Sequence, residues 1–102
     1  MQKSQKRERR GKKPAEQLNV DQMMQRIRDN LMLLGGEAHR RDIIEAVARD
    51  VGVNVLSIPE DLETAVIHSF EEGWRDAQKR EAYGFTLRFG EGSHRWGLQK
   101  AG

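Results

Sequence analysis

The chain has no cysteine and only two prolines among its 102 residues. Without cysteine it forms neither a disulfide nor a thiolate zinc site, a composition typical of reducing compartments. No apolar run approaches the roughly 20 residues that a membrane-spanning helix requires, and no apolar block near the first residue resembles a secretory signal. From its length and these absences we expect one cytoplasmic domain with no membrane segment.

Charge is distributed unevenly along the chain. Residues 1–17 hold seven of the 18 Lys and Arg residues and two acidic residues, which gives a net charge of +5. Residues 18–102 hold the other 11 basic residues against 14 acidic ones, which gives a net charge of −3. The basic character therefore belongs to the first segment, and any affinity of the later residues for nucleic acid must rest on local patches.

Residues 1–17 are predicted to form a disordered basic arm that precedes a domain over residues 18–102. Residues 2–13 contain no apolar side chain, so this segment buries too little surface to offset the entropy of ordering it. Its cations, Lys12 and Lys13 among them, favour contact with nucleic-acid phosphates. A solubilising extension or a linker end is the alternative interpretation.

The clearest two-residue period lies near the end of the sequence. Apolar and polar residues alternate over residues 85–89, and the alternation resumes at Trp96 after a short Gly-rich stretch. This pattern predicts an antiparallel hairpin. An isolated hairpin is marginal in water, so its apolar face is predicted to cover helices. That face consists of Phe85, Leu87, Phe89, Trp96 and Leu98.

Three amphipathic segments precede the hairpin, and the first spans residues 20–34. Asn19 or Asp21 can cap its start, and Asn19 and Gln22 have the spacing of a capping box. Gly35-Gly36 is typical of a helix C-terminus. The apolar stripe recurs at steps of three and four residues, which indicates one buried face. It consists of Val20, Met23, Met24, Ile27, Leu31 and Leu34.

The second helix is predicted over residues 39–51, with a buried face that includes Ile43 and Val47. Its first turn is unusual because Arg40 and Arg41 place positive charge at the positive end of the helix dipole. A phosphate bound at this terminus would offset the repulsion. Screening of the cluster by Asp42, Glu37 or solvent is the alternative.

The third helix is predicted over residues 59–82, starting at Pro59 or capped by Ser57. Its inner stripe includes Leu62, Val66, Phe70 and Gly73, and Ile67, Trp74 and Ala77 widen it. Gly73 is predicted to mark a kink or a break into a fourth helix. The preceding residues 54–57 are predicted to be extended and to pair with the hairpin as a third strand.

Residues 57–73 contain five acidic residues and no Lys or Arg. In a helix-turn-helix protein the helix after the turn enters the major groove, where such a helix would be repelled by phosphate. One hypothesis is that DNA is contacted instead by Arg75, Lys79 and Arg80, which follow this stretch. The competing hypothesis is that the acidic helix docks on a basic protein partner, as in an adaptor associated with the transcription machinery.

Arg88 and Arg95 lie opposite the apolar face of the predicted hairpin. Basic side chains on a solvent-facing hairpin favour contact with phosphates or the minor groove, and an ordinary solvated face is the alternative. The three histidines have no paired carboxylate or nucleophile at a telling spacing. We therefore predict no catalytic residue, no metal ligand and no cofactor.

Three stretches of the sequence resemble a known family. Residues 33–43, with their Gly35-Gly36 turn, resemble the opening of the N-terminal winged-helix domain of Mrr-type restriction proteins and of the related HARE helix-turn-helix domains. Residues 70–77 and 95–98 resemble the later helix and the wing strand of those domains. The resemblance covers roughly residues 20–99, and it implies a DNA-recognition or chromatin-associated module without nuclease activity of its own.

Together these patterns predict an α+β winged helix-turn-helix fold, with three or four helices and a C-terminal β-hairpin wing. The expected function is non-enzymatic binding of double-stranded DNA, in an accessory or regulatory role in transcription or restriction. The oligomeric state is left open by the sequence. The candidate DNA-binding residues are Lys12, Lys13, Arg40, Arg41, Arg75, Lys79, Arg80, Arg88 and Arg95.

Overall fold

The computed structural model describes residues 18–99, in which four helices and three short strands occur. The helices are α2 (Val20–Leu33), α3 (Arg40–Asp50), α4 (Glu60–Arg75) and α5 (Ala77–Tyr83). The strands are β1 (Glu37–His39), β2 (Phe85–Thr86) and β3 (Arg95–Leu98). The predicted α+β class is thereby confirmed. The predicted disordered arm, with Lys12 and Lys13, lies outside the described residues.

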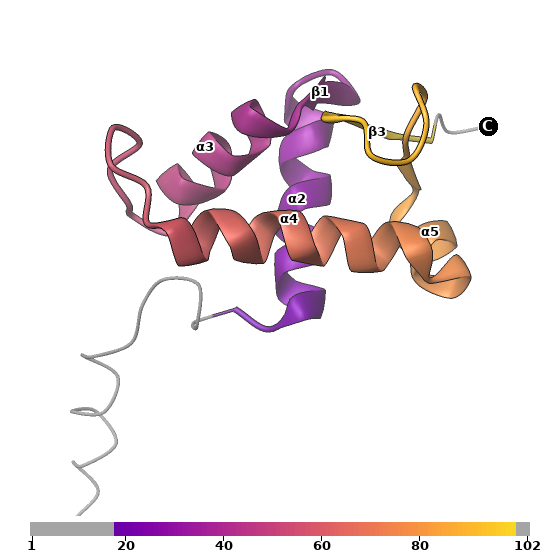
Figure 1. Ribbon diagram of the computed structural model, residues 1–102, viewed down its shortest axis with the longest axis horizontal. Helices are drawn as coiled ribbons and strands as arrows, with labels where there is room; N and C mark the ends of the chain where they lie inside the picture. Colours follow the sequence, from indigo (N-terminus) through magenta and orange to yellow (C-terminus); the bar gives the residue numbers. More distant parts are fainter. Residues whose placement is uncertain (1–17, 100–102) are drawn as a thin grey trace, which may run out of the picture.

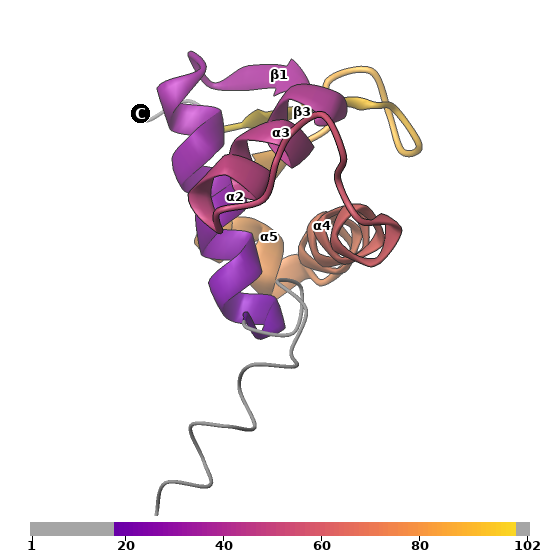
Figure 2. The same ribbon diagram turned by 90° about the vertical axis from the view of Figure 1, so that its left-hand side faces the viewer.

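The sheet lies at one end of α2 and α4, with α3 directly after β1. In Figure 1, α4 runs horizontally across the molecule, α2 crosses it behind, and the strands lie at the upper edge. The orthogonal view in Figure 2 again places the strands at the top, with α4 and α5 below them. The sheet therefore covers the helices from one end, as the apolar face of the hairpin predicts.

The predicted capping box begins α2. The Gln22 backbone N–H donates to Asn19 Oδ1 at 2.8 Å, and the Asn19 N–H donates to Gln22 Oε1 at 3.0 Å. Met23, Met24, Ile27 and Leu31 are buried, which confirms most of the predicted stripe. Leu34 is the exception, because it lies at the C-cap and its side chain is 46% exposed.

The sheet is antiparallel in the order β1–β3–β2. The predicted hairpin is confirmed, with Phe85 opposite Leu98 and Thr86 opposite Gly97. Its first strand is only two residues long, and residues 87–94 form a loop, which we call the β2–β3 loop. On the other side of β3, Ala38 lies opposite Trp96.

The third strand was predicted over residues 54–57, and this prediction is wrong. Residues 54–57 form a turn in which the Leu56 N–H donates to Asn54 Oδ1 at 2.9 Å. The strand is instead β1, because Gly35 and Gly36 adopt positive φ and reverse the chain directly after α2. The Leu98 N–H then donates to Gly36 O at 2.8 Å, which brings this segment beside β3.

The third predicted helix is divided, but the break predicted at Gly73 lies at Asp76. Gly73 is inside α4 and is buried. Asp76 leaves the helical conformation, and its side chain accepts from the backbone N–H groups of Gln78 and Lys79. Asp76 is therefore the N-cap of α5. Of the two predicted starts of this helix, the start at Pro59 is close to the observed one, since α4 begins at Glu60 with Pro59 as its N-cap, whereas the cap at Ser57 does not form.

Aromatic side chains join the sheet to α4. The rings of Phe70 and Trp96 are parallel, with centroids 4.1 Å apart, and Phe85 lies against Phe70 at 4.8 Å. Phe89 was predicted to belong to this apolar face, but it is 62% exposed. Because strand pairing ends at Thr86, the alternation of faces stops before Phe89. Ala77, predicted to widen the inner stripe of a third helix over residues 59–82, is the first residue of α5 and is exposed.

Candidate nucleic-acid interface

Seven of the candidate DNA-binding residues lie in the described part of the chain. The fold brings four of them to the β2–β3 loop and to the sheet that it connects: Arg40, Arg75, Arg88 and Arg95. Arg41 lies between α3 and α4, where its guanidinium faces Glu45 and Glu63. Lys79 and Arg80 belong to α5 and make their contacts with α4.

Arg40 is held at the loop by its backbone. Its N–H donates to the carbonyl oxygen of His94 at 2.6 Å. Its side chain, together with Arg75, Ser93 and Trp96, lines a cavity of about 70 Å³ between α4 and the loop. Within residues 18–99, no hydrogen bond or ion pair engages the Arg40 guanidinium. Arg40 therefore keeps its donors available for a ligand.

His39 caps α3, a role that the sequence analysis missed. Its Nδ1 accepts from the Arg41 backbone N–H at 2.9 Å, so that nitrogen is unprotonated in this arrangement. The ring also lies edge-on to His94, with centroids 5.8 Å apart. The only sequence signal was the position of His39 just before the helix, because histidine is not a usual N-cap residue.

The carboxylate of Glu37 binds Arg88 of the β2–β3 loop and Arg95 of β3. Arg88 donates to it through Nη2 at 2.8 Å and Nε at 3.1 Å, which is a bidentate pair. Arg95 adds a bond from Nε at 3.3 Å. The hydrogen bonds from Arg88, followed by those from Arg95, outweigh partial desolvation and lower the pKa of Glu37.

The prediction that Arg88 and Arg95 face outward is confirmed, with side chains 65% and 47% exposed. Two guanidinium groups share one carboxylate, so the cluster keeps an excess positive charge. In the sequence analysis, Glu37 was considered only as one of the groups that could screen the positive charge of Arg40 and Arg41 at the start of α3. Its partners come from residues more than 50 positions away, and no local pattern reports them.

Arg75 connects the end of α4 to the loop. Its Nε lies 3.5 Å from Glu91 Oε2, and both side chains are mostly exposed. An ion pair this open contributes little stability, so the arginine can exchange Glu91 for another anion at small cost. The loop therefore presents arginines from α3, α4 and β3 around one edge of the fold.

Lys79 and Arg80 are occupied by contacts within the helices. Lys79 Nζ donates to Glu72 Oε2 at 3.1 Å, and this bond raises the pKa of Lys79. Arg80 donates to the Trp74 carbonyl at 3.0 Å, and its guanidinium carbon lies 4.8 Å from the centre of the Trp74 ring. These two residues brace α5 against α4, and they do not join the arginines at the loop.

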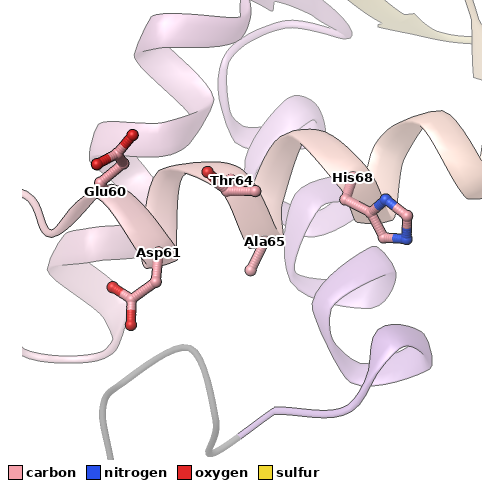
Figure 3. Close-up of a pocket in the computed structure, with 5 residues that line it drawn as sticks. All are labelled: Glu60, Asp61, Thr64, Ala65 and His68. Atoms are coloured by element: carbon pink, nitrogen blue, oxygen red, sulfur yellow. The ribbon is translucent and has the colours of Figure 1, made fainter.

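The exposed side of α4 has the opposite character. A shallow hollow on its first half is lined by Glu60, Asp61, Thr64, Ala65 and His68 (Figure 3). Within residues 18–99, no three acidic or histidine side chains are grouped as a metal site requires. No described helix combines the length and apolarity needed to cross a membrane.

Comparisons of this chain with protein-family models, with curated proteins and with solved structures find no match.

Proposed function

We propose that this chain is a winged-helix module that binds duplex DNA through phosphate contacts. The order of elements supports the fold assignment: helix, strand, three helices, and then two strands joined by a loop. In this assignment β1 is the strand between the first two helices, the β2–β3 loop is the wing, and α5 is an addition after the third helix. The fold alone does not define the function, so the proposal rests on the arginines.

The observation that carries the proposal is the gathering of Arg40, Arg75, Arg88 and Arg95 around the β2–β3 loop. They come from four separate segments, and only tertiary packing brings them to one edge. Arg40 has no ionic partner within the described residues, and Arg75 is held only by an exposed pair with Glu91. Guanidinium groups bind phosphate oxygens in the same planar, bidentate geometry in which they bind carboxylate oxygens.

The acidic exposed side of α4 indicates how DNA would be bound. A helix with five acidic residues and one Arg would be repelled from the major groove, so base reading by α4 is not part of the proposal. The loop and the start of α3 would instead hold the backbone, with Lys12 and Lys13 adding charge. Contacts of this kind position a protein on DNA without specifying sequence.

A polarisation titration with a labelled duplex of about 20 base pairs tests the proposal at roughly 50 and 200 mM salt. We expect binding that weakens steeply with salt and depends little on sequence. Replacing Arg40 and Arg95 by Gln should weaken it. Replacing Arg49 and Lys79 by Gln is the matched control, since the same charge is removed away from the loop.

Absence of binding at both salt concentrations would contradict the proposal. So would equal losses in the two double variants, because affinity would then follow total charge and not the arginines at the loop. A third outcome is that the Arg40 and Arg95 variant binds as well as wild type, whereas neutralising Lys12 and Lys13 abolishes binding. This result would assign the affinity to residues 1–17 alone.

A second candidate function is docking of a basic protein partner on α4. The supporting observation is that Glu60 and Glu71 have no ionic partner within residues 18–99. A pull-down with charge reversal at Glu60, Asp61 and Glu63 tests this alternative. Loss of a partner that the wild-type chain retains supports it, and retention of every partner contradicts it.

A further inference from the structure

The β2–β3 loop carries an exposed aromatic side chain that the core does not use. Phe89 is 62% exposed, and the other large apolar side chains exposed within residues 18–99 are aliphatic. Figure 2 shows this loop extending beyond the sheet on the side away from α2. Single exposed apolar residues are common on protein surfaces, so the argument depends on what surrounds Phe89.

Arg88 covers one face of the Phe89 ring. Its guanidinium carbon lies over the ring, 4.6 Å from the ring centre, which is a cation–π contact. The same guanidinium is fixed to β1, because it donates to Glu37 Oε1 at 2.8 Å and to Glu37 Oε2 at 3.1 Å. Within the described residues, no other aromatic or cationic group contacts the Phe89 ring. The ring is therefore supported on one face and open on the other.

The backbone of the loop holds this side chain in place. The Gly90 N–H donates to Leu87 O at 2.9 Å, and the Ser93 N–H donates to Gly90 O at 3.1 Å, so two turns follow one another. Phe89 is the third residue of the first turn, and Leu87, at its start, packs against the core. A side chain fixed in this way loses little conformational freedom when a ligand stacks on it.

The charges near the ring favour a nucleic-acid strand. Residues 87–94 contain a single acidic residue, Glu91, and its carboxylate faces Arg75 at 3.5 Å. Arg88 and Arg95 share the one carboxylate of Glu37, which leaves an excess of positive charge. An aromatic side chain beside cations is the combination by which proteins bind unpaired nucleotides, since the cations hold phosphates while the ring stacks on a base.

We propose that the open face of Phe89 stacks on an unpaired base of the bound DNA. A side chain that wedges between two stacked base pairs needs both faces of its ring, and Arg88 covers one of them. A single open face fits a single base, and a base that is already unpaired costs least to unstack. The inference rests on the proposed function and adds to it a preference for DNA that contains an unpaired base.

The test uses the labelled duplex of the polarisation titration with one unpaired adenine inserted at its centre. The matched probe carries an abasic nucleotide at the same position, so that the phosphates are the same and only the base is missing. We expect wild type to bind the adenine probe at least about fivefold more tightly, which is the lower end of the effect of stacking on an aromatic side chain.

Variants of exposed side chains assign this preference to the ring. Phe89→Leu keeps an apolar side chain but removes the ring, so the ratio of the two affinities should fall to near one. Phe89→Trp keeps an aromatic ring and should keep the preference. Leu33→Ala is the control, because it removes an apolar side chain that is 81% exposed at the end of α2, and it should leave the ratio unchanged.

The outcomes separate this inference from the proposed function. If wild type binds the adenine and abasic probes equally, the inference is overturned and the proposed function stands. If Phe89→Leu weakens binding of the fully paired duplex as much as binding of the adenine probe, the ring acts on paired bases and the inference is again overturned. If none of the duplexes is bound, the proposed function fails, and this inference fails with it.

Discussion

The ring of Phe85 fills the space beside Gly73. A Cβ added at Gly73 would lie 2.8 Å from Cε2 and 2.9 Å from Cδ2 of Phe85. Real Cβ atoms essentially never approach other heavy atoms this closely, so the first residue of β2 can pack on α4 only because residue 73 lacks a side chain. Gly73 is thus a contact between helix and sheet, whereas its position in the sequence suggested a helix break.

Gly73→Ala should lower the free energy of unfolding, by up to about 2 kcal/mol. Overpacking costs about 1–3 kcal/mol, and the better helix propensity of alanine returns at most about 1 kcal/mol. Urea denaturation measures the change. In a Phe85→Val background, which removes both ring atoms, the same substitution should cost less. An equal cost in both backgrounds would show that the clash is not the cause.

Glu37 should make stability depend on pH. Its pKa in the folded protein is lowered below the ordinary 4.5 by Arg88 and Arg95. Its contribution is therefore fully present above about pH 4.5 and is lost as the pH falls through the lower folded value. Glu37→Gln should be less stable than wild type at pH 7, and the difference should shrink in acid. Glu81→Gln is the exposed control, and parallel pH curves for Glu37→Gln and wild type would contradict the expectation.

Asp76 should determine whether α5 forms. Its carboxylate accepts from the N–H groups of Gln78 at 2.9 Å and Lys79 at 3.2 Å. Removing an N-cap costs typically about 1 kcal/mol, and a seven-residue helix has little stability of its own. Asp76→Ala should increase amide hydrogen exchange at Arg80 and Gly84, whose N–H groups donate to the carbonyl oxygens of Asp76 and Arg80 at the two ends of α5. Asp76→Asn keeps the acceptor and should stay near wild type.

Arg40 should contribute more to DNA affinity than Arg49, at the opposite end of α3. Under the proposed function, Arg40→Ala removes about one phosphate contact, so it should weaken binding several-fold and reduce the salt slope by about 1. Arg49→Ala removes the same charge from an exposed position away from the loop. It should leave the slope nearly unchanged. If the logarithm of the binding constant falls with the logarithm of salt concentration at the same slope in both variants, the placement of the interface at the loop is contradicted.

Local patterns in the sequence predicted the helices and much of the core. The capping box at Asn19 and the apolar stripe of α2 depend on neighbours three and four residues apart, so the chain itself reports them. The hairpin was predicted for the same reason. The length of its first strand was not predicted correctly, because the alternation of apolar and polar residues continues to Phe89, whereas strand pairing ends at Thr86.

The candidate site was less accessible to sequence analysis. Arg88 and Arg95 were chosen by charge and position, but the carboxylate that they share was not foreseen. Glu37 reaches Arg88 across 51 positions in the sequence and Arg95 across 58. Contacts at such separations depend on strand order, and the strand paired with the hairpin was placed at residues 54–57 in error.

The amino-acid sequence by itself determined the capped start of α2 at Asn19, the apolar stripe of that helix, and how charge is divided between residues 1–17 and the rest. These properties arise from side chains that are neighbours along the chain. Only the tertiary structure decided that β1 follows α2 directly, that Gly73 accommodates Phe85, and that four arginines gather at one loop. Those relationships join residues far apart in sequence, and they exist only once packing has selected one arrangement of the elements.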